Sequence, residues 1–289
     1  MTISYMVCIL EVKTTQSVHI KTLVEALCPL LSDISIHFYP KKIKNDEGDL
    51  VDGGIMIKEI NKTSTILIHC KLDADKFDTY DYNYKAPKLS IGINLNNFLK
   101  CIKCMASCDT MTWRIDSDDI NKLVMILESA NEKKTFKINL MDLEMMDLDI
   151  EPVKFTYKVK MQTQDFQNYC KNMLNVATDG KMEIKCLDNT LFIGGSGDLG
   201  TIEFEIVTTN NNSGLYIKKE NSNTYEIPQG KFELKYLIIF TKCSNMCTHV
   251  TLYLKNNYAL VIEYNVSTLG VIKFVLSPCK KYNELDDHM

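Results

Sequence analysis

The stretch from Asn139 to Met161 constrains this sequence most, because neither a regular helix nor a buried strand accommodates all of it. Its first part is rich in methionine and carries the carboxylates of Asp142, Glu144, Asp147, Asp149 and Glu151. Pro152 then prevents a regular helix, since its backbone nitrogen has no hydrogen to donate. From Phe155 onward apolar residues alternate with others, which predicts a strand. The stretch lies near the midpoint of the 289 residues, and we interpret it as an extended connector between two similar halves.

Length and composition set broad limits. A chain of 289 residues favours about two domains, and no run reaches the roughly 18 apolar residues of a membrane span. The N-terminus lacks the basic region of a signal peptide, so we expect none. Eleven scattered cysteines favour a reducing compartment over a disulfide framework. A net charge of −4 argues against a protein that binds nucleic acid over its whole surface, but it permits a basic stripe on one face.

Hydrophobic periodicity predicts an α+β protein in which short strands at hairpin spacing alternate with amphipathic helices. Two helices fall in each half, at residues 18–28, 94–106, 163–175 and 230–243. Strands are predicted at residues 5–12, 34–39, 55–60, 65–72, 88–93, 110–116, 121–129, 134–141, 154–161, 181–187, 190–194, 201–207, 224–228, 248–254, 259–265 and 270–277. The polar stretch from Lys41 to Gly54 predicts a long hairpin loop. The second half repeats the element order of the first, which indicates an internal duplication.

The predicted helices carry lysines beside their apolar stripes. These are Lys21, Lys100, Lys103, Lys171, Lys231, Lys235 and Lys242. On any one helix, an ordinary solvated face is the simpler interpretation. Acidic residues, however, concentrate in the connector, the loops and the tail. If all four helices lined one surface, that surface would be basic within an acidic shell.

Three other patterns resemble sites of chemistry, and we interpret each as structural. The run Gly195 to Gly200 fits the dinucleotide fingerprint, but an alternating strand follows it where that motif requires a helix. Two groups have cysteines at suggestive spacing but lack a complete ligand set. They are Cys101, Cys104 and Cys108, and Cys243, Cys247 and His249. No serine or histidine arrangement indicates a nucleophile with its base. We therefore predict no metal site, no cofactor and no enzymatic activity.

Several blocks, in order and at matching spacing, resemble one family. They are FDTY at 77–80, INLNNFLKCIKC at 93–104, NLMDLEMMDLDI at 139–150, VKMQTQDFQNYC at 159–170, GSGDLG at 195–200, LKYLIIFTK at 234–242, ALVIEY at 259–264 and IKFVLSP at 272–278. The chain thereby resembles the proliferating cell nuclear antigen family, the eukaryotic DNA sliding clamps. The resemblance implies a clamp fold of two similar domains, each with two helices on an inner face and antiparallel sheets outside. On this basis we predict domains at 1–138 and 157–289, joined by a connector at 139–156.

The resemblance also implies a ring of three subunits around duplex DNA. Diffuse lysine contacts to phosphates suit such a ring, because they hold position without reading sequence. The DNA-facing role carries over to Lys21, Lys100, Lys103, Lys171, Lys235 and Lys242. Positions that are usually basic in the family are here Thr22, Cys28 and Asn168. We therefore expect an inner surface that is less positive than usual.

By the same resemblance, partner peptides would bind a groove between the connector, a front loop and the C-terminal strand. Its expected residues are Ile60, Leu148, Ile150, Ala259, Val275, Ser277 and Pro278, with Ala259 in place of the usual proline and Val275 in place of the usual tyrosine. From the residues alone, the simpler interpretation is that Leu148 and Ile150 pack onto their own domain. Subunits would join through strands near 133–139 and 197–206, with Phe136 facing Met173 and Val176.

The implied partners are double-stranded DNA, DNA polymerase and other proteins with clamp-binding peptides, a clamp loader and further copies of the chain, without a membrane. The implied place is the nucleus, or a cytoplasmic site of viral replication. One alternative stays open at this point. It is a partner-binding scaffold of clamp fold that acts as a monomer or hetero-oligomer and does not encircle DNA.

Overall fold

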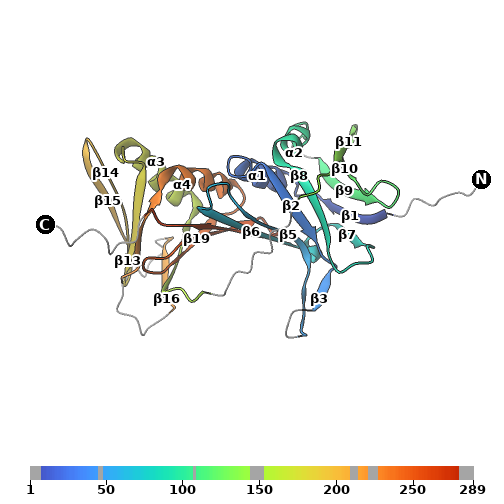
Figure 1. The fold of residues 1–289 in the computed structure, drawn as a ribbon. Coiled ribbons are helices and arrows are strands. Elements are labelled where there is room, and N and C mark those ends of the chain that lie inside the picture. The colour runs from blue at the N-terminus through green and yellow to red at the C-terminus, as the bar shows by residue number, and fades with distance from the viewer. Residues whose placement is uncertain are drawn as a thin grey trace, which may run out of the picture. The chain divides into compact units, whose positions relative to one another are not determined.

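The structure is a computed structural model that describes residues 8–44, 48–106, 109–143, 153–208, 214–220 and 227–279. Its contacts divide the chain into two compact units (Figure 1). The first unit comprises Met1–Glu59, His69–Leu148 and Val266–Ile272, and the second comprises Ile60–Ile68, Asp149–Asn265 and Lys273–Met289. The predicted domain boundaries at 138 and 156 stay a prediction, because much of the connector lies outside the described residues.

The first half of the chain supplies most of the first unit. Its elements are β1 (Cys8–Thr14), α1 (Ser17–Leu27), β2 (Asp33–Phe38), β3 (Lys42–Lys44), β4 (Leu50–Asp52), β5 (Gly54–Ile60), β6 (Ile66–Asp73), β7 (Thr79–Tyr82), β8 (Leu89–Asn94), α2 (Leu95–Ile102), β9 (Thr110–Asp116), β10 (Lys122–Glu128) and β11 (Lys133–Asn139). An antiparallel sheet runs in the order β11-β10-β9-β1-β7, and β5, β2 and β8 lie side by side in another. Helices α1 and α2 pack against each other over the sheets (Figure 1).

The second half supplies most of the second unit. Its elements are β12 (Tyr157–Gln162), α3 (Thr163–Val176), β13 (Lys181–Leu187), β14 (Thr190–Gly197), β15 (Gly200–Val207), β16 (Tyr216–Lys219), β17 (Gln229–Glu233), α4 (Leu234–Phe240), the 3-10 helix η2 (Thr241–Asn245), β18 (His249–Leu254), β19 (Leu260–Val266) and β20 (Gly270–Leu276). One antiparallel sheet runs β15-β14-β13-β17, and β16, β12, β18 and β19 follow one another in a second. Helices α3 and α4 pack against each other.

Corresponding strand orders confirm the predicted internal duplication. The series β7-β1-β9-β10 in the first unit matches β16-β12-β18-β19 in the second. In each series, the second strand leads directly into the first helix of its unit, α1 or α3. Burial also alternates as predicted: along β12, Tyr157, Val159 and Met161 are buried and the residues between them are not. The predicted α+β class and its duplicated plan are thus both present.

Helix α2 shows how local signals fix an element. Asn94 is its N-cap, and its side-chain oxygen accepts a hydrogen bond from the Asn97 amide at 3.0 Å, which satisfies one of the free donors of the first turn. Leu95, Phe98 and Ile102 are buried along one side. The helix ends at Ile102 instead of the predicted residue 106.

The predicted helix at 230–243 is wrong in its first turn. Residues Gln229–Glu233 form β17, which pairs with β13 through Lys231 opposite Glu183, and α4 begins only at Leu234. Phe232 and Leu234 are both buried, so this sequence also fits the two-residue period of a strand. The segment pairs with β13 and is therefore a strand and not the first turn of a helix.

Strand prediction failed mainly where strands are short. The loop predicted from Lys41 to Gly54 is a hairpin, with β3 and β4 paired and an ion pair between Lys42 and Asp52. Strands β7 and β16, of four residues each, were not predicted. The strand predicted at 224–228 falls largely outside the described residues, and its described end is not a strand.

The glycine run at 195–200 lies in the β14–β15 hairpin, so the prediction of a turn is confirmed. Gly200 has φ +133, a conformation that L side chains rarely adopt. A Cβ at Gly197 would overlap the carbonyl oxygen of Val176 at the end of α3. The glycines therefore permit a tight turn that closely approaches the C-terminus of α3. A strand follows this turn, so it does not open the helix whose N-terminus binds phosphate in the dinucleotide motif.

Candidate DNA interface and peptide groove

In the first unit, the predicted DNA-facing lysines lie on or just after the two packed helices. Lys100 and Lys103 are exposed, and Lys21 is half-buried. The Lys100 ammonium donates a hydrogen bond to Asn97 at 3.3 Å. His19, also on α1, has a pKa lowered by burial, which favours its neutral form. The positive charge of this helix pair therefore comes from lysine.

In the second unit, Lys171 on α3 and Lys242 on η2 are exposed. Lys235 is exposed too, but its ammonium lies 2.9 Å from a carboxylate oxygen of Glu233 and 4.8 Å from the centre of the Tyr236 ring. The hydrogen bond that the Lys235 ammonium donates to Glu233 is the largest reason that the pKa of Lys235 is raised. Part of its charge is thus balanced within the chain.

Acidic residues are scarce on these helices. Glu25 and Asp165 are the acids among the residues of α1 to α4. The positions expected to be basic from the resemblance are neutral, and Thr22, Cys28 and Asn168 all have exposed or half-buried side chains. Each helix pair, taken by itself, therefore presents a moderately positive surface suited to phosphate contacts without base recognition.

The described residues of the predicted peptide groove all belong to the second unit. Ile60 is 36% exposed, Ser277 is exposed, and Ala259, Val275 and Pro278 are half-buried. Leu148 and Ile150 lie outside the described residues.

The turn that follows Ile60 is held in a fixed shape. The buried side chain of Asn61 accepts hydrogen bonds from the amides of Thr65 and Ile66, both at 2.9 Å. The Ser277 amide in turn donates to the carbonyl oxygen of Thr65 at 2.9 Å. These bonds bring the front turn beside the C-terminal strand, so two of the three predicted walls of the groove are adjacent.

Beside Ala259 lies a group of aromatic residues that the sequence reasoning missed. The Phe155 ring contacts Tyr253 at 5.6 Å and Tyr258 at 6.2 Å between centroids. A pocket of about 550 Å³ lies here, lined by Lys154, Phe155, Lys158, Glu220 and Tyr253. The outward position of Tyr253 in the alternating strand HVTLYL is the signal that could have found it.

The charges around Tyr253 are balanced within the chain. Its hydroxyl donates to Glu263 at 3.2 Å, and Lys273 pairs with the same carboxylate at 3.0 Å. Burial, followed by the charge of Glu263, raises the pKa of Tyr253 to about 12, so the hydroxyl stays protonated. This surface offers apolar rings with hydrogen-bonding groups at their margin.

The strands predicted to join subunits are present as β11 and β15, each at the edge of its sheet. Phe136 and Val176 are half-buried. Met173 requires a correction, because its side chain is fully buried inside the second unit. The helical period places Met173 on the buried side of α3 with Phe166 and Cys170, so its side chain packs in the core and offers no surface to another subunit.

Two further sequence patterns can be located. Cys104 is exposed and Cys101 half-buried, with the pKa of Cys101 raised by burial, and Cys108 lies outside the described residues. Within the described ranges, no cluster of three or more histidine, cysteine, aspartate or glutamate side chains could hold a metal ion. None of the described helices is long and apolar enough to cross a membrane.

Two similar units, each with a packed helix pair backed by antiparallel sheets, define the class of DNA sliding clamps. The N-terminal domain model of the proliferating cell nuclear antigen family matches residues 9–152, and the C-terminal domain model matches residues 149–279. The chain belongs to this family, which confirms the resemblance and the clamp fold. It is also similar to the "Probable DNA polymerase sliding clamp 1" of Paramecium bursaria Chlorella virus 1, with 26% identity over 272 residues that cover 93% of this chain and 96% of the relative.

Proposed function

We propose that this chain encircles duplex DNA as a ring of identical subunits and tethers DNA polymerase and other replication or repair proteins to it. The observation that carries this proposal is the pair of exposed, lysine-bearing helices in each of two duplicated units of a sliding-clamp family member. The lysines Lys21, Lys100, Lys103, Lys171, Lys235 and Lys242 face the DNA. The alternative, a scaffold that does not encircle DNA, gains no support from the family or the relative.

Tethering explains why no catalytic group is required. A clamp raises the effective concentration of its partner at the template, which lengthens synthesis without any chemistry of its own. We therefore propose a non-enzymatic role, with DNA, polymerase, a clamp loader and two further copies of the chain as partners. The site of action is the nucleus, or a cytoplasmic replication site if a virus encodes the chain.

The peptide groove is the second part of the proposal. Ile60, Ala259, Val275, Ser277 and Pro278 line it together with Leu148 and Ile150 of the connector. Aromatic side chains beside Ala259 extend its apolar surface toward β12. A short peptide with an aromatic or aliphatic anchor suits such a surface, because a few buried anchors carry most of the affinity at interfaces of this kind.

Primer extension on a long circular template tests the tethering role. A DNA polymerase that carries a clamp-binding peptide should make products at least about tenfold longer when this chain and a clamp loader are added, since tethering replaces repeated rebinding. The variant Val275→Lys should remain on the DNA but lose the effect, because a charge enters the apolar groove. Leu187→Lys, at a position 39% exposed at the end of β13 and off the helices, is the matched control. Product lengths that do not respond to the wild-type chain contradict the proposal.

A further inference from the structure

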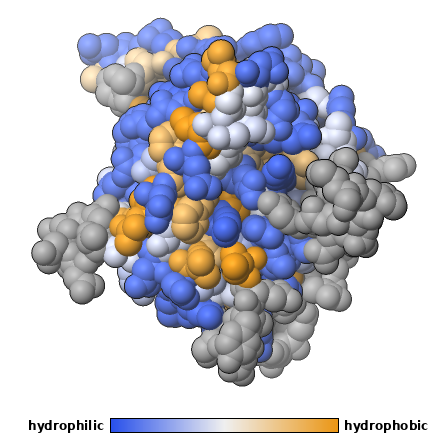
Figure 2. All heavy atoms as spheres, turned by 90° about the vertical axis from the view of Figure 1, so that its left-hand side faces the viewer, coloured by the Kyte–Doolittle hydropathy of each residue, from blue (hydrophilic) through white to orange (hydrophobic). Residues whose placement is uncertain are grey.

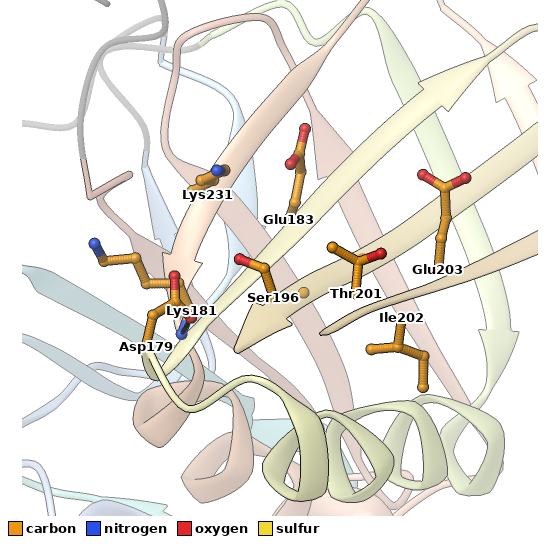
Figure 3. A pocket seen from close by; sticks show the side chains of 10 residues that line it. Asp179, Lys181, Glu183, Ser196, Thr201, Ile202, Glu203 and Lys231 are labelled. Carbon is orange, nitrogen blue, oxygen red and sulfur yellow. Dashed lines mark hydrogen bonds between the residues drawn. The ribbon is translucent and has the colours of Figure 1, made fainter. Parts of the chain in front are cut away.

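The two sheets of the second unit differ in the side chains that they turn outward, away from α3 and α4. On the sheet β15-β14-β13-β17, acids and lysines are mixed around a hollow of about 420 Å³. Both signs of charge line this hollow, from Asp179, Lys181, Glu183, Glu203 and Lys231 (Figure 3). Figure 2 shows the side of the second unit that β14, β15 and α3 occupy in Figure 1, and apolar groups there lie between polar ones. The outward face of this sheet therefore favours neither an anionic nor a cationic ligand.

The outward face over β16, β12 and β18 is instead basic and aromatic. Burial alternates along β12, so Lys158 and Lys160 point outward. Lys158 pairs with Lys218 of β16 on one side and with Tyr253 of β18 on the other. Lys160 pairs with Tyr216, which is 57% exposed, and a pocket of about 550 Å³ opens on the same face. The lysine–aromatic surface, as we define it, consists of Lys154, Phe155, Lys158, Lys160, Tyr216 and Tyr253.

Two acids border the lysine–aromatic surface, and ion pairs within the chain balance both. Glu220 lies 3.0 Å from the ammonium of Lys218, and Glu263 lies 3.0 Å from that of Lys273. In the part of the chain that the structure describes, the three lysines of the surface itself have no ion pair. An anionic partner therefore meets three unpaired ammonium groups, and complementary charge of this kind speeds association and guides orientation.

The positions of the ammonium groups favour a peptide over a nucleic acid strand. Lys158 and Lys273 lie 5.3 Å and 5.8 Å from the centre of the Tyr253 ring, and Lys255 lies 5.2 Å from that of Tyr258. Bases of a single strand stack on open ring faces, so they would have to displace these ammonium groups. A peptide needs only the pocket beside the rings for an apolar side chain and the lysines for its carboxylates. The surface therefore fits an acidic peptide.

The lysine–aromatic surface continues from the predicted peptide groove. Tyr258 directly precedes Ala259 of the groove, and its ring lies 6.2 Å from the Phe155 ring. The Phe155 ring lies 5.6 Å from that of Tyr253, and all these residues belong to the second unit. An extended peptide advances about 3.3 Å per residue, so roughly four residues span the three rings. A segment that leaves the groove beside Ala259 can thus reach the pocket without a long linker.

We propose that the lysine–aromatic surface binds an acidic segment of a clamp partner, adjacent to the peptide that the same partner places in the groove. Carboxylates of the segment pair with Lys154, Lys158 and Lys160, and one apolar side chain enters the pocket beside Phe155. The inference rests on the proposed function and names the chemistry of the partner outside its anchor residues. Because the two segments are joined, weak contacts at the surface raise the affinity of the whole partner.

Fluorescence anisotropy with the full chain and a labelled synthetic peptide of glutamate, phenylalanine and glycine tests the proposal. The variant Lys154→Glu with Lys158→Glu and Lys160→Glu should weaken binding by about tenfold or more, since like charges then oppose each other. Phe155→Ala should also weaken binding by about tenfold, because the apolar anchor loses a wall of its pocket. Wild-type affinity should fall as salt rises, because the charges lie at the surface.

The matched control is Lys181→Glu with Lys185→Glu and Lys231→Glu, which makes the same change in net charge on the outward face of the other sheet. Circular dichroism verifies that each variant is folded. Equal loss of affinity in the control overturns the proposal, and so does a wild type that binds the acidic peptide no tighter than one with lysine in place of glutamate. If the first variant loses affinity for labelled oligothymidylate and not for the peptide, the surface is a nucleic acid site and the proposal is overturned.

A joined peptide tests the link to the groove. The acidic peptide is attached to the clamp-binding peptide of the polymerase, and the product should bind at least about tenfold tighter than either part. Val275→Lys should remove the contribution of the clamp-binding part and leave that of the acidic part. Where both parts bind, a joined peptide no tighter than its parts overturns the proposal. If the acidic peptide binds and responds to the variants while the clamp-binding peptide alone does not bind, the surface stands and the proposed groove fails.

Discussion

Replacing Lys100, Lys103, Lys171 and Lys242 with alanine is expected to remove most of the non-specific affinity for duplex DNA. Each lysine that neutralises a phosphate contributes about 0.9 to the slope of log K against log salt, so the four together should reduce that slope by about 3.6. Lys235 is left in place because Glu233 already balances part of its charge at 2.9 Å. Fluorescence anisotropy with a short labelled duplex, at salt from about 50 to 200 mM, measures the slope.

The control replaces four exposed lysines that lie off the helices. They are Lys62, Lys88, Lys154 and Lys255. This variant has the same net charge as the helix variant, so a general loss of positive charge would affect both equally. We expect its slope to match that of the wild type. Equal slopes for the two variants would show that the helices do not form the DNA surface.

Phe240→Ala should cost about 3 to 5 kcal/mol of the free energy of unfolding of the second unit. The ring is fully buried and stacks on Phe274 with 4.2 Å between centroids and 14° between planes. Alanine would leave a cavity between α4 and β20, and surrounding side chains fill such a space only in part. Because folded domains are stable by roughly 5 to 15 kcal/mol, this loss threatens the whole helix pair of the unit.

Urea unfolding followed by circular dichroism measures the effect of Phe240→Ala. Phe192→Ala is the matched control, since this ring lies half-buried on the outward face of β14 under the ammonium of Lys185. Its loss should cost less, because water can occupy the vacated space. If the midpoint falls no further for Phe240→Ala than for Phe192→Ala, the stacked pair is not central to the second unit.

Period and spacing in the sequence predicted the elements whose signals are local. The α3 helix was predicted at 163–175 and occupies Thr163–Val176, because Phe166, Cys170 and Met173 recur at helical spacing. By contrast, β7 depends on a distant partner. Tyr80 and Tyr82 pair with Val12 and Leu10 of β1, which no four-residue window can reveal.

Side-chain partners were harder to predict than side-chain faces. Lys235 was predicted on an exposed helix face. If the helix had included Glu233, that residue would point to a different side from Lys235, because residues two apart in a helix do not face each other. The structure ends β17 at Glu233 and begins α4 at Leu234, and this junction brings Glu233 and Lys235 together. The aromatic group at Phe155, Tyr253 and Tyr258 was missed for a similar reason, since Phe155 lies far from the two tyrosines in the sequence.

The central claim is that the chain encloses duplex DNA, and the topology of the DNA tests it most directly. The protein is loaded onto a nicked circular plasmid, passed through a gel-filtration column at moderate salt, and then treated with an enzyme that cuts the plasmid once. An enclosing ring stays on the circle and slides off the ends of the linear form, so we expect the bound protein to be lost after cutting. Equal retention on circular and linear DNA would contradict the account.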